Sequence, residues 1–323
     1  MSVTINIPHV RWSAIALATV AIPAIINSSV AADTVLTLNK DFIEAFKSRV
    51  TIDADYIVDK AHKHPNPPEK DGDLHAAGRS DQIGLPVVAE IENAIEVPEA
   101  VAKIHAAEGS GRPLKISGVW RIWPEHGGEH TFVQGEALSP FDTTNPPHVF
   151  EIHPVTQIDG ESLLSRLHPI HGFETKNAEQ AFTVYERTRS TIEVGPDGRT
   201  VTITTPMAGY NYVEFIMRLT KRQFRGTDGE FVFANILGRD KDLIVHNRRI
   251  AFVKDSIPDQ KQKSMQTGDC LHLLGIPRVD LALVSWRAEH AGQRPEILAW
   301  SMPYEMVAVG AYDEVIPAAE CGE

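Results

Sequence analysis

The stretch LPVVAEIENAIEVPEAVAKIHAAEGSGRPLKISGVWRIW (85–123) decides the fold class of this chain. It opens and closes with runs, 85–93 and 114–123, that are rich in β-branched or aromatic residues, as is typical of strands. Between them, Pro98, an alanine-rich interior and Gly109 predict one short helix. A helix inserted among several short strands is the pattern of a small β-barrel, so we expect an OB-like barrel here.

Strand patterns continue on both sides of this stretch. DGDLHAAG precedes it and HVFEIHPVTQI (148–158) follows it. Further on, STIEVGPDGRTVTITT (190–205) predicts a hairpin with a Pro-Asp-Gly turn, and more short strands follow without long helical spacers. We therefore predict a mainly β protein, in which an OB-like small barrel with one or two short helices precedes an antiparallel, β-sandwich-like region. The expected parts are a lead-in helix and loop at 33–68, the OB-like barrel at 69–175, the antiparallel β domain at 176–312 and a C-terminal tail at 313–323.

The N-terminus has the pattern of a secretory signal peptide. Arg11 precedes an apolar run over 12–26. Val30 and Ala32 then place small residues at positions −3 and −1 of a cleavage site. The apolar run is shorter than the roughly 20 residues that span a bilayer. We therefore expect residues 1–32 to be a signal peptide, and the mature protein to be periplasmic or extracellular with no transmembrane segment.

Composition narrows the class of partner. The chain has 323 residues, of which 42% are hydrophobic and 23% charged, so it is globular rather than disordered. Its formal net charge is −12, whereas proteins that bind nucleic-acid phosphates carry an excess of basic residues. We therefore expect duplex nucleic acid not to be a partner. Cys270 and Cys321 are the only cysteines, which excludes a disulfide scaffold and a cysteine-based zinc site. In an oxidising compartment these two could pair.

Acidic and imidazole side chains recur at every second position of three predicted strands in the first barrel. Side chains two apart on a strand point to the same face. If the three strands are neighbours, these groups converge, and carboxylates with imidazoles suit Zn²⁺ or Mn²⁺, whereas carboxylates alone suit Ca²⁺. The residues are Asp71, Asp73 and His75 on the first strand, Glu90 and Glu92 on the second, and Glu151 and His153 on the third.

The alternative is an antiparallel sheet with one wet face, which alternates in the same way without any chemistry. Two observations favour a site. Acidic residues are poor strand formers, and ten of the fourteen histidines lie between His62 and His171. The resulting hypothesis has Glu90 as a general base beside a divalent ion (Zn²⁺, Mn²⁺ or Ca²⁺) that activates water. Its expected ligands are Asp73, His75, Glu151 and His153.

One further histidine motif lies in WPEHGGEH (123–130). Its H-x-x-E-H spacing matches a metalloprotease helix signature, which requires a helix. Pro124 and the pair Gly127-Gly128 favour a turn instead, so we do not expect that site. A loop that donates one histidine, His126, to the strand cluster stays open.

Two tryptophans suggest a separate possibility, a surface that stacks on sugars. Trp120 and Trp123 lie three apart on a predicted strand and therefore face opposite sides. At least one of them is expected in the core, and the other is a candidate platform.

The run DGDLHAAG…VVAEI…ISGVWRIWPEH…HVFEIHPV resembles a loose group of exported bacterial proteins with no settled activity. They carry a D-x-D-x-H strand, an A-E-[IV] strand and a late E-[IL]-H-P-V strand. The resemblance covers about residues 69–158. It implies that one small β domain contains Asp71, Asp73, His75, Glu90, Glu151 and His153.

Three functions therefore compete for this exported protein. The first is a ligand-binding or structural module without chemistry. The second is a metal-dependent, phosphodiesterase-like hydrolase that uses the acid and imidazole cluster. The third is a carbohydrate-binding protein that uses the exposed tryptophan. The sequence identifies no specific partner.

Overall fold

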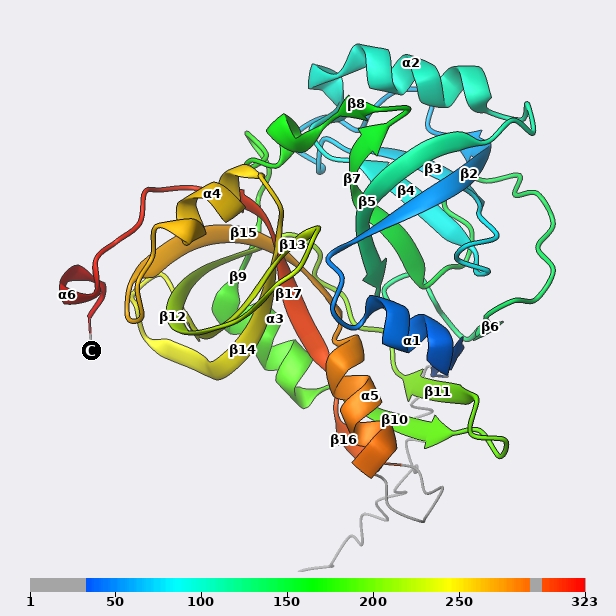
Figure 1. Ribbon diagram of the computed structural model, residues 1–323. Coiled ribbons are helices and arrows are strands. Elements are labelled where there is room, and N and C mark those ends of the chain that lie inside the picture. Colours follow the sequence, from blue (N-terminus) through cyan, green and yellow to red (C-terminus); the bar gives the residue numbers. More distant parts are fainter. Residues whose placement is uncertain (1–32, 291–297, 323) are drawn as a thin grey trace, which may run out of the picture. The chain divides into compact units, whose positions relative to one another are not determined.

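The computed structural model describes residues 33–290 and 298–322, so the expected signal peptide at 1–32 lies outside the described residues. In the described part the strands form three sheets, and two of these sheets close into five-stranded barrels (Figure 1). The prediction of a mainly β protein with small barrels is confirmed.

The first barrel is the OB-like barrel that the sequence predicts. Its strands follow the order β4-β3-β2-β5-β7, and a parallel pairing of β4 with β7 closes it. The helix that the alanine-rich stretch predicts, α2 (Pro98–Ala107), begins at its proline and lies at one end of this barrel (Figure 1). The five strands are β2 (Thr51–Ala61), β3 (Leu74–Arg79), β4 (Val87–Ile91), β5 (Leu114–Ile122) and β7 (Phe150–Ile158).

The barrel begins earlier in the chain than the sequence patterns suggest. The segment expected as a lead-in helix and loop does contain a helix, α1 (Lys40–Phe46), but β2 follows it and is the first barrel strand. In β2, buried Ile52, Tyr56 and Val58 lie at even positions between more exposed residues. This period of two is that of a strand with one face in the core.

The second barrel repeats the connectivity of the first. Its strands follow the order β13-β14-β17-β15-β12, and a pairing of β12 with β13 closes it. As in the first barrel, one helix separates the third and fourth strands, and the third and fifth strands pair in parallel. The elements are β12 (Val213–Arg225), β13 (Gly229–Leu237), β14 (Leu243–Val253), α4 (Ile257–Lys263), β15 (Cys270–Val279) and β17 (Tyr304–Ala311).

The third sheet collects strands from outside the barrels, in the order β16-β10-β11-β1-β6. The predicted hairpin forms its centre as β10 and β11.

No helix in the described ranges is long and apolar enough to cross a membrane.

The third sheet consists of β1 (Thr34–Asn39), β6 (Thr131–Val133), β10 (Arg189–Val194), β11 (Thr200–Thr205) and β16 (Leu298–Ser301); the remaining elements are β8 (Glu161–Ser162), β9 (Lys176–Asn177), α3 (Ala178–Arg187), α5 (Leu281–His290), α6 (Ala318–Cys321) and 3₁₀ turns at Ala94–Glu96 and Leu164–Arg166.

Side chains of the second barrel lie directly against the first. The hydroxyl of Tyr212, just before β12, contacts Asp73 and His153 of the first barrel. The carbonyl of Pro277 on β15 accepts a hydrogen bond of 2.9 Å from Arg121 Nε on β5. Polar groups on this outer face of the first barrel are therefore removed from water although they do not point into its core.

The C-terminal segment is attached to the second barrel by a disulfide between Cys270 and Cys321. Ile316 pairs with Cys270 as an isolated β-bridge, and the disulfide packs beside Ile216 and Leu237. The two cysteines that the sequence left open as a pair are joined.

Loss of this disulfide is expected to lower the free energy of unfolding by about 2–4 kcal/mol, because the bond closes a loop between positions 51 residues apart. Urea unfolding of the Cys270→Ser/Cys321→Ser variant measures the loss. Reductant should shift the wild-type midpoint in the same direction and leave the variant unmoved. A variant as stable as the oxidised wild type would contradict the expectation.

Candidate metal centre

A row of charged and imidazole side chains crosses the outer face of the first barrel. Strand alternation produces it: in β4, Ala89 and Ile91 belong to the hydrophobic core, so Glu90 between them points outward. In β7, Ile152 is likewise in the core, and its neighbours Glu151 and His153 point outward.

The sheet registers then bring these side chains together across strands. His75 on β3 pairs with Glu90 on β4. Glu151 on β7 pairs with Arg121 on β5. The row therefore runs over four consecutive strands, β3-β4-β7-β5. We call it the ligand face, because β3 and β4 are the second and third strands of the barrel, and OB-folds bind their ligands on the face of those two strands together with adjoining loops.

This face is rich in carboxylates and buried. Asp73, Glu90, Glu92 and Glu151 are each 3% exposed or less. Arg121, fully buried, bonds to Glu151 through Nη1 and to Glu125 through Nη2 at 3.1 Å. One guanidinium thus faces several acids. Buried carboxylates in such excess need a proton or a further cation.

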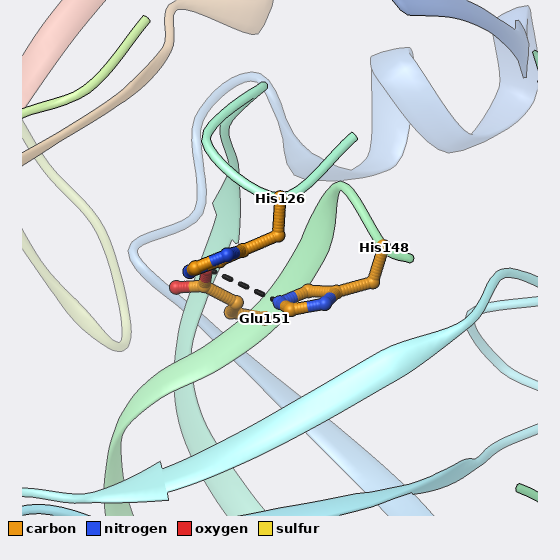
Figure 2. Close-up of side chains that lie close together, drawn as sticks. All are labelled: His126, His148 and Glu151. Atoms are coloured by element: carbon orange, nitrogen blue, oxygen red, sulfur yellow. Dashed lines mark ion pairs between the residues drawn. The ribbon is translucent and has the colours of Figure 1, made fainter. Parts of the chain in front are cut away.

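We call His126, His148 and Glu151 the rim triad, because His126 is only partly buried whereas the other two are 1–2% exposed. Figure 2 shows the two imidazole rings and the carboxylate grouped together. One nitrogen of each ring and a carboxylate oxygen all lie within 4.8 Å of one another. His148 Nε2 is 3.5 Å from Glu151 Oε1.

The hydrogen bonds of His148 fix which of its nitrogens carries a proton. Nδ1 lies 2.7 Å from the carbonyl oxygen of Pro146, which only accepts, so Nδ1 is the N–H. Nε2 faces Glu151 Oε1 at 3.5 Å and makes no hydrogen bond in the described structure. Burial lowers the pKa of His148, but Glu151 outweighs burial and raises that pKa, so Nε2 attracts a cation. A ligating histidine is commonly oriented in this way, with its second nitrogen bonded to a carbonyl.

The backbone holds His126 beside His148. The amide of His148 donates to the carbonyl of His126 at 3.2 Å, and the two rings stack with centroids 4.9 Å apart. His126 lies in a turn without helical structure, as Pro124 and the glycine pair predict. At Gly127 a Cβ would come within 2.6 Å of the Thr34 side chain, so only glycine lets the turn pass β1 so closely.

The charges around the rim triad favour the binding of a cation. Burial raises the pKa of Glu151, but Arg121 and His148 outweigh burial and hold that pKa well below its ordinary value. Glu151 is therefore an ionised ligand. Burial lowers the pKa of His126, and the neighbouring His148 lowers it further, which keeps the His126 ring neutral and able to bind metal.

A second group, the inner triad, consists of Asp73, Glu90 and His153, which are all 3% exposed or less. His153 Nδ1 is 3.0 Å from Glu90 Oε2, and His153 Nε2 is 2.8 Å from the hydroxyl of Tyr212. Burial raises the pKa of Glu90 to about 7 and raises that of Asp73 well above its ordinary value.

The structure thus divides the ligand set predicted from sequence. Asp73 and His153 meet in the inner triad with Glu90, the expected base, whereas Glu151 joins the rim triad. His75 is 3.7 Å from Glu90 and stacks on His62. It forms a third group with Asp71 and Asp73 in the turn before β3.

Glu92 and the two tryptophans lie apart from these groups of possible ligands. Both carboxylate oxygens of Glu92 are buried without a hydrogen-bond partner in the described structure. Trp120 and Trp123 are each 1% exposed. Neither indole therefore offers the surface that sugar stacking requires, because Arg278 stacks on Trp120 and Tyr185 packs edge-on against Trp123, which lies beyond the end of β5.

Sequence reasoning missed three members of this site. His148 precedes β7 and falls outside the strand periodicity, although the Pro-Pro pair before it marks an irregular segment that could have drawn attention to it. Arg121 was missed because it lies in a strand whose other residues are mostly apolar. Tyr212 comes from the second barrel, and no local pattern predicts that contact.

A hollow beside the first barrel lies away from these groups. A hollow of about 430 Å³ is lined by residues that include Asp55, Arg79 and Glu136. None of the rim or inner triad residues line it. The acidic and imidazole groups of the first barrel are therefore separate from this hollow.

Comparison with family models and with curated proteins finds no match. Among solved structures, the chain is similar to the Ifi202 HINa domain in complex with 20-bp double-stranded DNA, with 11% identity over 83% of this chain and 99% of that chain and a TM-score of 0.21. A structure described as "Structural mimicry for functional antagonism" has 11% identity over 84% of this chain and 98% of that chain, with a TM-score of 0.20. Similarities at this level carry no argument about what the chain binds.

The expectation that duplex nucleic acid is not a partner is corrected, because it does not stand as an exclusion. The first of the two neighbours was solved on duplex DNA. The expectation rested on a net charge of −12, which averages over the whole chain and does not describe any local surface. Net charge therefore does not exclude this class of partner.

Proposed function

We propose that this protein is an exported metal-binding protein whose rim triad holds a divalent transition metal on the ligand face of the first barrel. The observation that carries it is the convergence of two imidazole nitrogens and one carboxylate oxygen within 4.8 Å of one another, with the buried His148 Nε2 making no hydrogen bond in the described structure. A nitrogen in that position, beside an ionised carboxylate, takes up a cation, and the third ligand from His126 favours a metal ion over a proton there.

The spacing of these atoms suits a metal ion. Ligand atoms bound to one tetrahedral zinc at 2.0–2.2 Å lie about 3.3 Å from each other. His148 Nε2 and Glu151 Oε1 are 3.5 Å apart before any ion is bound. Two imidazoles with one carboxylate suit Zn²⁺, Fe²⁺ or Ni²⁺ better than Ca²⁺ or Mg²⁺.

Export is part of this proposal. A disulfide such as that between Cys270 and Cys321 is typical of oxidising compartments, which supports the signal-peptide pattern of the N-terminus. A hydrolytic reaction is not assigned, because Glu90, the base expected from sequence, faces His153 rather than the rim triad.

Zinc is expected to stabilise the chelator-treated mature protein, by about 2.7 kcal/mol at a free concentration of 100 times Kd. The reason is that the ion binds the folded rim triad and not the unfolded chain. His148→Ala and His126→Ala should each weaken binding by more than about 100-fold, since each removes a ligand. Calorimetric titration and thermal melting measure both effects.

His64 and His171, which are exposed, provide matched controls. His64→Ala and His171→Ala should bind zinc as the wild type does. Zinc binding that survives in both rim variants, or no binding by the wild type, would refute the rim site.

A further inference from the structure

We infer that the inner triad, Asp73, Glu90 and His153, is a second and separate cation site, located where the two barrels meet, and that it takes an oxygen-preferring divalent ion such as Mn²⁺. The inner site does not depend on the rim site, because the two share no ligand.

Tyr212 determines how His153 presents its nitrogens. The tyrosine hydroxyl donates to Asp73 Oδ2 at 2.6 Å and accepts from His153 Nε2 at 2.8 Å. His153 Nδ1 then lies 3.0 Å from Glu90 Oε2 and 3.2 Å from Glu151 Oε2. A buried nitrogen between two carboxylate oxygens requires a positive centre, which is either a proton or a metal ion.

Unpartnered oxygens at the same place strengthen this inference. Asp73 is 1% exposed, and its Oδ1 has no hydrogen-bond partner among the described residues. One ligand atom from each member of the inner triad lies within 4.8 Å of the others. Glu92, 1% exposed and also unpartnered, lies near Asp73, and burial raises the pKa of both carboxyl groups well above their ordinary values. A divalent ion would replace the proton that burial favours and would satisfy Asp73 Oδ1.

Arg121 separates the two sites. Its Nη1 bonds to Glu151 Oε2, the oxygen nearer His153, while Glu151 Oε1 faces His148. The guanidinium thus occupies the position that a metal would need in order to bridge both triads through Glu151. We therefore assign Glu151 to the rim triad alone.

The ligands of the two sites differ in chemistry and access. Two carboxylates with one imidazole favour Mn²⁺ more than the imidazole-rich rim triad does. All three inner residues are buried by both barrels, so an ion enters as the protein folds and leaves only when that contact opens. Retention against a chelator is the consequence that can be measured.

The test uses the full mature chain, unfolded in guanidinium with EDTA and refolded in the presence of Mn²⁺. The protein is then desalted through EDTA, which strips exposed ions, and its manganese content is measured by elemental analysis. The expected result is one Mn²⁺ retained per chain in the wild type and in His148→Ala. Asp73→Asn should retain none, and Tyr212→Phe should lose its ion at least tenfold faster.

Asp81→Asn, a change at an exposed aspartate, is the matched control and should retain one ion. Fluorescence of the buried tryptophans verifies that each variant has refolded. If the folded wild type retains no manganese, the cation between His153 and Glu90 is a proton and the inner site is refuted, whatever zinc does at the rim triad. If Asp73→Asn retains as much manganese as the wild type, the ion lies elsewhere and the assignment is also overturned.

Discussion

Replacing Arg278 with methionine is expected to lower the free energy of unfolding by about 3–5 kcal/mol, because it breaks a buried ion pair from one side. Arg278 is fully buried, and its Nε donates to Glu305 Oε1 at 2.7 Å. Its Nη1 donates to the carbonyls of Val50 and Trp120, both at 3.0 Å, and its guanidinium stacks 3.6 Å from the centroid of the Trp120 ring. Arg278 thus joins β15 of the second barrel to the first barrel.

Urea unfolding of Arg278→Met measures this loss. Arg199→Ala, which removes an arginine that is 85% exposed, is the control and should change stability by less than about 0.5 kcal/mol. Removing both partners in Arg278→Met/Glu305→Leu should cost less than the single change, since Glu305 is then absent and Arg249, its other partner at 2.8 Å, keeps its ion pair with Asp280. A loss below 1 kcal/mol in the single variant would show that Arg278 does not hold the barrels together as we describe.

Arg121→Met is expected to lower the free energy of unfolding by a similar amount, about 3–5 kcal/mol, in the metal-free protein. The change removes the guanidinium that bonds to buried Glu151 and to Glu125. It also leaves the carbonyl of Pro277 without its donor. The loss of positive charge beside Glu151 is the larger part of the effect, because that carboxylate is 2% exposed.

Zinc should restore part of the stability of Arg121→Met, since an ion in the rim triad supplies the charge that Glu151 has lost. Thermal melting with and without zinc measures this recovery, and Arg121→Met/His148→Ala is the matched variant that should not recover. Equal recovery in both variants would mean that zinc acts at some other place.

The local sequence pattern was enough to predict the first barrel. It did not predict the strand with which this barrel begins, β2, or the second barrel that packs against it. Pro98 and Gly109 bound the inserted helix, and alternation identifies the strands on either side. β2 lies within the stretch expected as a lead-in helix and loop, and it has no clear strand pattern because its acidic residues obscure the buried Ile52 and Tyr56. The second barrel repeats the connectivity of the first without an internal sequence repeat, so only the pairing of strands distant in sequence reveals it.

The sequence predicted a cluster of carboxylates and imidazoles, but not its division into a rim triad and an inner triad. Alternation correctly gathers Glu90, Glu151 and His153 on one face. The strands that carry His75 and His153, β3 and β7, are however not direct neighbours. β4 lies between them and places Glu90 beside both histidines. The division into two triads depends on Arg121 and on Tyr212 of the second barrel, and such contacts have no signature within a single strand.

Anomalous diffraction from crystals of the mature protein grown with zinc tests the central claim most directly. We expect one anomalous peak at the zinc edge, located between His148 Nε2, Glu151 and His126 and about 2.0–2.2 Å from each ligand atom. The same crystals of His148→Ala should lack that peak. A wild-type map with no zinc between these three side chains, at a zinc concentration that saturates the titration, would contradict the account.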